Sequence, residues 1–328
     1  MSVLITGASG FVGLNIAEAL VAQGREVVLF SNAPLPQAAR EALTRQPGRM
    51  HAVLGDVRER RDLDQAFSEF RPSQVVHAAA MTPGVARERT EGRATFEVNV
   101  LGTLTALEAA ATHAIGRFVY VSSGAVYGRS AFEVRVLDEA KTAPAPENFY
   151  AVSKLAAERL SLRFGELAGL DVRACRLSSV FGPWERDTGV RETLSPIFQV
   201  TRLALAGEAA VLPRSGPRDW IYSRDVAAAI VAILDAPAPS FDLYNIAPGV
   251  TWTVEQWCAN LVRQFPHFSY RLAEEPVAAN VDFWSERDRA PLASDRLESD
   301  LGFRAAHGLD TAFADFMQWL KKTAQPLS

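Results

Sequence analysis

A tyrosine and a lysine stand four positions apart in the segment Asn148-Phe-Tyr-Ala-Val-Ser-Lys154. Lys154 is one of only four lysines in a chain whose basic side chains are otherwise arginines. A lysine ammonium is a compact charge whose pKa responds to its surroundings, whereas arginine stays protonated. Residues four apart lie on one face of a helix. A phenol beside such an ammonium can act as a base, so Tyr150 and Lys154 are candidate catalytic residues.

A glycine-rich segment near the start of the chain is typical of a phosphate-binding turn. It follows an apolar run, precedes a helical pattern and places three glycines in a G-x-x-G-x-x-G spacing. Glycine allows the backbone to turn tightly and approach a pyrophosphate, and a helix N-terminus offers free N–H groups. We therefore expect a dinucleotide to contact Gly7, Ser9, Gly10, Phe11, Val12 and Gly13.

The end of the second predicted strand leaves the choice of dinucleotide open. An acid at this point normally binds the adenosine ribose of NAD, but the strand ends at Ser31 without one, and Arg40 is the nearest downstream arginine. Ser31 can donate to a ribose hydroxyl or to a 2′-phosphate, so the expected cofactor is NAD or NADP. Asp56 is a candidate acceptor for the adenine amine, and capping of the next helix explains it equally well.

Apolar runs alternate with helical patterns through the first half of the chain. Continuous β-branched runs between helices indicate a parallel sheet buried on both faces. The alternation predicts an α/β fold, a doubly wound parallel sheet of the Rossmann type. The predicted strands are 3–6, 26–30, 50–54, 74–79, 117–122, 171–177 and 242–246, and the predicted helices are 11–23, 63–70, 96–113, 149–166, 227–235, 253–265 and 311–321.

The sequence pattern changes after Pro183, where prolines recur and the alternation of strands and helices becomes irregular. We expect residues 1–177 to form the dinucleotide-binding domain, with residues 225–247 returning to it. Residues 178–224 and 248–328 are expected to form a smaller substrate-binding lobe that closes over the sheet.

Composition argues against several other classes of protein. The net charge of −4 gives no basic excess to hold a nucleic-acid backbone. No apolar run approaches the roughly 18 residues of a membrane span, and no secretory leader is visible. The two cysteines and five histidines have no metal-ligand spacing. We therefore expect a cytoplasmic protein without a metal, a nucleic-acid partner or a membrane.

Four motifs together are more specific than any one of them. The glycine loop, Gly55-Asp-Val57, Val121-Ser-Ser-Gly-Ala-Val-Tyr-Gly128 and Tyr150-Ala-Val-Ser-Lys154 occur in this order along the chain. Their order and spacing resemble the extended short-chain dehydrogenase/reductases, and most closely the NAD-dependent epimerase/dehydratase family. The resemblance extends over nearly the whole chain.

The resemblance implies hydride transfer at a secondary alcohol or ketone of a sugar, sugar acid or nucleotide sugar. Tyr150 would be the general base and acid, although an unperturbed tyrosine has a pKa of about 10. The positive charges of Lys154 and the oxidised nicotinamide would lower that pKa. Lys154 would also hold the nicotinamide ribose. Ser123 would hydrogen-bond the reacting oxygen, with Ser122 as its rival for this role.

The resemblance also implies contacts at positions that the residues alone do not single out. The further cofactor positions are Val57, Ala78, Ala79, Ala80, Asn99, Leu177, Ser179 and Val180. The substrate positions are Thr82, Ser123, Gly124, Ala125, Ser179, Arg218 and Arg289. The alternatives are core packing for the alanines, a polar helix interior for Asn99 and a salt bridge for Arg218.

The chain departs from the family pattern at two places. Nucleotide-sugar members usually carry asparagine at the position of Ser179, where it meets the substrate diphosphate, whereas Arg218 matches their diphosphate-clamping arginine. The chain therefore keeps one of the two residues that bind the diphosphate, and the remaining arginine could also bind a sugar carboxylate. The family's dehydratases place Asp-Glu where this chain has Gly124 and Ala125, so we do not expect dehydration.

Two other functional classes compete with a sugar oxidoreductase or epimerase. One is a reductase of a non-sugar ketone or aldehyde, and the other is a non-catalytic dinucleotide sensor. The predicted helices 96–113 and 150–166 match those that pair between subunits in dimeric relatives, so a homodimer is expected.

Overall fold

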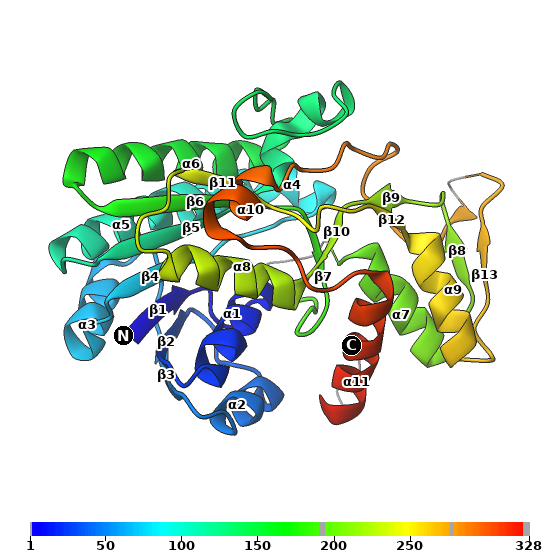
Figure 1. Ribbon diagram of the computed structural model, residues 1–328, viewed down its shortest axis with the longest axis horizontal. Helices are drawn as coiled ribbons and strands as arrows, with labels where there is room; N and C mark the ends of the chain where they lie inside the picture. The colour runs from blue at the N-terminus through cyan, green and yellow to red at the C-terminus, as the bar shows by residue number, and fades with distance from the viewer. Residues whose placement is uncertain (1, 190–193, 276–277, 324–328) are drawn as a thin grey trace.

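The computed structural model describes residues 2–189, 194–275 and 278–323. A seven-stranded parallel sheet forms its centre, in the order β11-β6-β5-β4-β1-β2-β3 (Figure 1). The strands are β1 (Ser2–Thr6), β2 (Glu26–Ser31), β3 (Arg49–Leu54), β4 (Gln74–His77), β5 (Arg117–Ser123), β6 (Asp171–Leu177) and β11 (Leu243–Ile246). The predicted doubly wound α/β fold is therefore confirmed.

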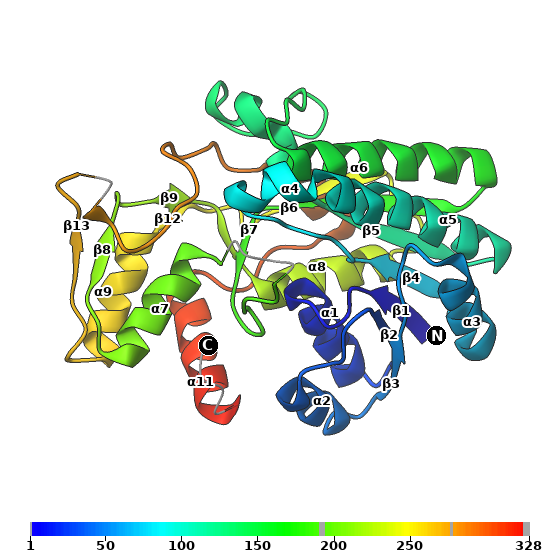
Figure 2. The same cartoon turned by 180° about the vertical axis from the view of Figure 1, so that it is seen from behind.

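Helices cover both faces of the sheet (Figures 1 and 2). On one face α1 (Phe11–Ala22) packs against α8 (Ser223–Asp235), with α2 (Gln37–Thr44) beside α1. On the other face lie α3 (Arg60–Phe70), α5 (Gly102–Thr112) and α6 (Phe149–Ala168). A further helix, α4 (Val85–Phe96), continues through the π-helical turn η1 (Glu97–Leu101) into α5. Burial on both faces explains the apolar runs of the inner strands, such as β1 and β2, whereas β3 at the edge of the sheet is partly exposed.

The remaining elements lie mainly at one end of the molecule (Figure 1). The helices there are α7 (Pro196–Ala206), α9 (Val254–Gln264) and α11 (Leu309–Thr323), and α10 (Asp295–Leu301) packs near β11. Short strand pairs join β7 (Ser179–Phe181) to β10 (Trp220–Tyr222), β9 (Pro217–Arg218) to β12 (Trp252–Thr253) and β8 (Ala210–Leu212) to β13 (Tyr270–Leu272). The 3₁₀ segment η2 (Gly124–Phe132) follows β5 directly.

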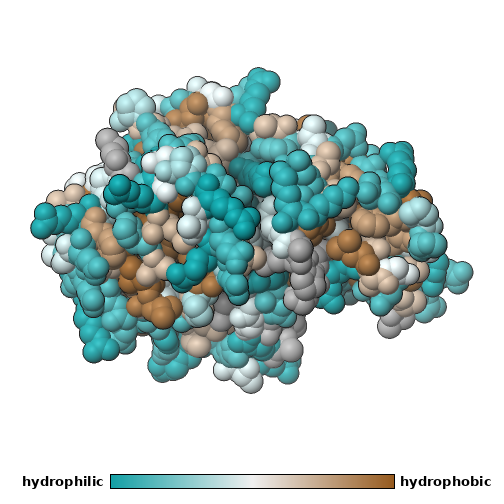
Figure 3. Space-filling model, turned by 90° about the horizontal axis from the view of Figure 1, so that it is seen from below, coloured by the Kyte–Doolittle hydropathy of each residue, from teal (hydrophilic) through white to brown (hydrophobic). Residues whose placement is uncertain are grey.

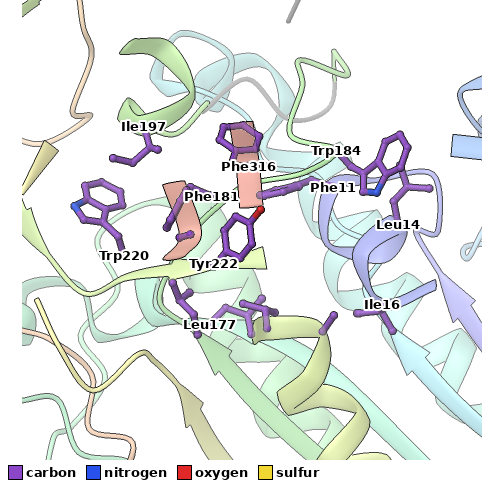
Figure 4. Close-up of a cluster of buried hydrophobic side chains, with 14 of the residues drawn as sticks. Phe11, Leu14, Ile16, Leu177, Phe181, Trp184, Ile197, Trp220, Tyr222 and Phe316 are labelled. Carbon is purple, nitrogen blue, oxygen red and sulfur yellow. The ribbon is translucent and has the colours of Figure 1, made fainter. Parts of the chain in front are cut away.

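One apolar cluster connects the sheet to this end of the molecule (Figure 4). Phe181, Trp184, Tyr222 and Phe316 are buried between α1 and the helices of the second part of the chain. Phe181 meets the rings of Trp252 and Trp257 edge-on. Because the cluster is continuous, the central sheet and the elements at this end of the molecule share one hydrophobic core.

The bounds of α6 follow from its end residues. The Asn148 side chain accepts a hydrogen bond from the Ala151 N–H at 2.8 Å and caps the first turn. Gly169 ends the helix with a φ of 67°, a left-handed conformation that glycine adopts without strain. The cap places Tyr150 in the first turn of α6, with Lys154 one turn further along.

A buried ion pair attaches α6 to the sheet. Glu158 and Arg176 are both fully buried, and their closest contact measures 2.6 Å. The Glu158 carboxylate also accepts from Ser122 Oγ at 2.7 Å, which adds a contact to β5. The Arg176 guanidinium lies over the Tyr127 ring, 4.7 Å from its centroid. This network determines how α6 sits on β5 and β6.

The surface is mixed in character. Hydrophilic residues cover much of the face in Figure 3, and hydrophobic residues form small groups between them. Within the described ranges, no helix has both the length and the apolar character needed to cross a membrane.

Glu158→Gln tests the importance of this ion pair. The substitution leaves Arg176 as a buried cation without its counter-charge, so we expect a loss of about 3–5 kcal/mol in the free energy of unfolding. Urea unfolding measures it. Glu166→Gln is the matched control, because it removes an exposed α6 carboxylate paired with Arg163 at 2.7 Å; its effect should stay below about 1 kcal/mol. Equal losses in the two variants would contradict the expectation.

Candidate active site

A cavity of about 2100 Å³ lies where the carboxyl ends of the central strands meet elements that follow β6 in the chain. β1 is the point at which the strand order reverses, because β2 lies on one side of it and β4 on the other. Ligands bind beyond such a switch point in open α/β sheets. The cavity is about twice the size of a typical pocket for one small molecule, which leaves room for a dinucleotide and a second ligand together.

Lys154 projects from α6 toward the end of β5. Lys154 is only 3% exposed, and its ammonium donates a hydrogen bond to the Val121 carbonyl. The nitrogen also lies over the Tyr120 ring, 4.5 Å from the centroid. Burial lowers the pKa of Lys154 to about 8, although the neighbouring Cys175 and Glu158 act in the opposite direction. Tyr150, one turn earlier and half-buried, lines the same cavity.

The two serines at the end of β5 have different environments. Ser122 is 2% exposed and gives its hydroxyl to Glu158. Both serines line the cavity, but Ser123 is less buried, and it caps η2 by accepting from the Ala125 N–H at 3.1 Å. This geometry favours Ser123 over Ser122 as the hydroxyl that meets a ligand.

The glycine loop packs too closely for side chains at two of its glycines. Gly7 has a φ of 65°, and a Cβ there would lie 2.7 Å from the Ala79 Cα. A Cβ on Gly13 would lie 2.4 Å from the Gly7 carbonyl oxygen. Gly10 is the N-cap of α1 and provides no side-chain cap, and a helix N-terminus of this kind favours an anion. These features fit the pyrophosphate of a dinucleotide.

The predicted ribose and adenine contacts lie beside the glycine loop. Ser31 is 5% exposed, and its hydroxyl lies 2.5 Å from that of Ser9. The side chain of Asp56 is paired with Arg58 at 2.6 Å, and this hydrogen bond is the main cause that lowers the pKa of Asp56. Val57 lines the cavity as well.

Asn99 differs from the other candidates because it is not in the wall of the cavity. It is 1% exposed and lies in the π-helical turn between α4 and α5. Its amide exchanges hydrogen bonds with the Met81 backbone, at 2.8 Å and 3.0 Å, and donates to Ser153 Oγ at 2.9 Å. Asn99 therefore positions the loop after β4 against α6.

The two candidate anion-binding arginines, Arg289 and Arg218, differ in whether a carboxylate of the protein is paired with them. Arg289 forms an ion pair with the buried Asp219 at 2.9 Å and reaches Ser178 Oγ at 3.0 Å. Arg218 makes no ion pair within the described ranges, and its guanidinium lies 5.4 Å from the centre of the Trp220 ring. Burial, with a smaller contribution from Arg289, lowers the pKa of Arg218 to about 10. Of these two arginines, Arg218 is thus the one with capacity for an external anion.

The other predicted contact residues also line the cavity. They are Ala78, Ala79, Ala80, Thr82, Gly124, Ala125, Leu177, Ser179 and Val180. Gly124 and Ala125 add no acid or base beside Ser123, as expected from the sequence.

Sequence reasoning missed three arginines in the cavity wall, Arg58, Arg186 and Arg214, and of these Arg186 lies against the glycine loop. Arg186 donates to the Ser9 carbonyl oxygen at 2.5 Å. The only signal was an arginine close behind the Gly182-Pro183 motif, and nothing in the sequence indicated that this segment returns to the glycine loop.

The model of the NAD-dependent epimerase/dehydratase family matches residues 3–247, well over half of the chain. The chain belongs to this family. The family description names NAD as the cofactor, and the glycine loop, its small neighbours and the uncapped end of α1 fit that dinucleotide.

The chain is similar to named proteins over nearly its whole length. The chain is 26% identical to the dTDP-L-rhamnose 4-epimerase of Burkholderia thailandensis over 97% of its own length and 94% of the relative's. It is 27% identical to a probable UDP-glucuronate 4-epimerase of Rhizobium meliloti, covering 97% and 96% of the two chains. Among solved structures it resembles MoeE5 in complex with UDP-glucuronic acid and NAD, with a TM-score of 0.78, 28% identity and coverage of 98% and 100%.

The buried Lys154 predicts a pH dependence of stability. Its pKa is about 8 in the folded protein, whereas the ordinary value for an exposed lysine is 10.5. Between these values the unfolded chain holds a proton that the folded protein has lost, so stability rises with pH, by up to about 3 kcal/mol. Lys154→Met lacks this contribution, and thermal unfolding of both proteins between pH 7 and about 10.5 measures the difference.

Lys141→Met is the matched control, because Lys141 is 85% exposed. This variant should follow the wild-type pH dependence throughout. A gap between wild type and Lys154→Met that stays constant with pH would contradict the assignment of a depressed pKa to Lys154.

Proposed function

We propose that this protein transfers hydride between NAD and a secondary alcohol or ketone of a sugar, sugar acid or nucleotide sugar. The observation that carries the proposal is the juxtaposition of Tyr150, Lys154 and Ser123 in one cavity with the glycine loop. The named relatives, which are 4-epimerases of nucleotide sugars, support a sugar-derived substrate and favour epimerisation.

Each residue of the triad has a separate task in the proposed mechanism. Tyr150 removes the hydroxyl proton of the substrate as its carbon loses hydride, and returns the proton when the ketone is reduced. Lys154 supplies the positive charge that favours the phenolate form of Tyr150. Ser123 donates a hydrogen bond to the reacting oxygen, which stabilises negative charge on it. Bound NAD supplies the hydride chemistry.

Two modes of turnover fit these residues. An epimerase retains its dinucleotide and returns hydride to the opposite face of the ketone, so it shows no net change in nicotinamide absorbance. A dehydrogenase exchanges its dinucleotide and shows that change. Arg218, which has no ion pair within the described ranges, supports a substrate with a phosphate or carboxylate group, and Ser179 in place of asparagine favours a smaller anion than a diphosphate. The use of NADP in place of NAD is tested by offering both dinucleotides.

Tyr150→Phe tests the central role of the phenol. The variant keeps the ring but lacks the exchangeable proton, so we expect NAD binding within about twofold of wild type and a loss of turnover of at least about a hundredfold. Turnover is followed with a panel of sugars, sugar acids and nucleotide sugars. Tyr270→Phe, in β13 outside the cavity wall, is the control and should retain wild-type activity. Unchanged turnover in Tyr150→Phe would overturn the proposal.

We further propose that the protein is a homodimer that pairs through the layer formed by α5 and α6. Four large hydrophobic side chains beside this layer are exposed: Leu101 at the end of η1, directly before α5, and Phe149, Val152 and Leu167 on α6. Leu101→Lys should convert the dimer to a monomer of 35.7 kDa in light scattering at micromolar concentration. Leu205→Lys on α7, also an exposed leucine, should leave the mass unchanged. A monomeric wild-type protein would contradict this proposal.

The division into a dinucleotide-binding domain and a substrate lobe also remains a proposal. It is supported by β11, which pairs with β6 in the main sheet, and by α8, which packs on α1. We propose a cytoplasmic location on the basis of the two buried free thiols, Cys175 and Cys258, because reduced cysteines are usual in that compartment.

A further inference from the structure

The side chain of Arg186 lies against the glycine loop with part of its hydrogen-bonding capacity unused. One terminal nitrogen, Nη2, donates to the Ser9 carbonyl oxygen at 2.5 Å. The other, Nη1, is buried and has no hydrogen-bond partner among the described residues. Arg186 and Ser9 line the same cavity as Gly10. A buried guanidinium nitrogen without an acceptor costs free energy. The side chain would therefore gain a hydrogen bond by turning this nitrogen toward an acceptor that a ligand in the cavity supplies.

The segment that carries Arg186 is held rigidly on α1. The Pro183 carbonyl accepts from Asn15 Nδ2 at 2.8 Å, and the Trp184 indole donates to Glu18 at 2.9 Å. Trp184 has a φ of 67°, an uncommon conformation for a bulky residue that these contacts maintain. Figure 4 shows Trp184 beside Leu14 of α1. Arg186 is therefore fixed relative to the same helix whose N-terminus forms the end of the glycine loop.

A second contact connects this segment to the opposite side of the cavity. Arg87, near the start of α4, donates to the Gly189 carbonyl. Gly84 and Glu88 from the α4 side and Thr188 from the Arg186 side line the cavity. The contact joins two walls of the site beyond the glycine loop.

We propose that Arg186 is a cofactor-retaining residue whose guanidinium binds the pyrophosphate of NAD against the glycine loop. A guanidinium is suited to this task because it offers several donors in one plane and its hydrogen bonds to phosphate are charge-assisted. The glycine loop supplies backbone donors, the Ser9 hydroxyl and the partial charge of a helix end, but no full positive charge. Arg186 adds a full charge from a distant segment of the chain. The inference rests on the dinucleotide site of the proposed function.

Retention of the dinucleotide has a direct bearing on the mode of turnover. In an epimerase the hydride must return to the substrate from which it came, so the cofactor has to stay bound through the whole cycle. A charged contact on the pyrophosphate slows dissociation without touching the reacting atoms. Arg186 therefore favours the epimerase mode over the dehydrogenase mode.

Calorimetric titration of protein stripped of nucleotide tests the proposal without any substrate. Three probes are used: NAD, ADP-ribose and adenosine. In Arg186→Gln the affinities for NAD and ADP-ribose should fall about ten- to a hundredfold, because a charge-assisted hydrogen bond to the pyrophosphate is lost. The affinity for adenosine, which has no phosphate, should stay within about twofold of wild type. Arg186→Lys keeps the charge with fewer donors and should fall between the two proteins.

Arg45→Gln is the matched control for the loss of one positive charge, because Arg45 is 76% exposed at the end of α2. It should bind all three probes as wild type does. Unchanged NAD affinity in Arg186→Gln, or an equal loss for adenosine, would overturn the role on the pyrophosphate. A wild-type protein that binds none of the probes would instead overturn the proposed function itself, so the two failures are distinguishable.

Discussion

Lys154 carries its ammonium from α6 into the interior, where the Val121 carbonyl accepts its hydrogen bond and the Tyr120 ring lies beneath it. A buried charge is tolerated only where such partners are in place. One turn further along, Glu158 forms its own buried pair with Arg176. Two charged groups of one helix are thus matched to partners on β5 and β6. Any rotation or sliding of α6 would separate both, so the position of Tyr150 is a consequence of interior electrostatics.

The glycine loop imposes a second constraint from the other side of the cavity. Close contact between Gly7 and Ala79 brings the ends of β1 and β4 together, and the contact of Gly13 with Gly7 brings α1 against its own loop. Both contacts exist because the chain has no side chain at these points. The glycine loop side of the cavity therefore depends on close backbone packing, whereas the α6 side depends on buried charged groups.

Much of the fold and part of the site could be predicted from the sequence. The seven strands of the central sheet were all identified, because parallel strands buried on both faces have continuous apolar runs. The helix that follows the glycine loop and α6 were identified as well. The segment Val85–Phe96 was not recognised as a helix, because it is rich in charge and has no clear apolar face. The helices α2, α7 and α10 were missed too.

Side-chain direction and long-range pairing could not be read from the sequence. Ser122 and Ser123 point to opposite faces of β5, and both faces are covered, so periodicity does not say which serine meets a ligand. The pairing of Arg289 with Asp219 joins segments that are 70 residues apart, and local patterns carry no information about it. The role of Asn99 depends on a π-helical turn, which has no sequence signal of its own.

The position of Trp184 gives the protein an internal optical reporter. Its indole is 2% exposed, gives its N–H to a carboxylate of α1 and meets the Trp319 ring edge-on at 5.1 Å. The same short turn leads to the guanidinium on the glycine loop. Fluorescence emission of an indole responds to the local electric field and to ring contacts. Anion binding at the loop is therefore expected to change the emission of this indole, which is one of six tryptophans in the chain.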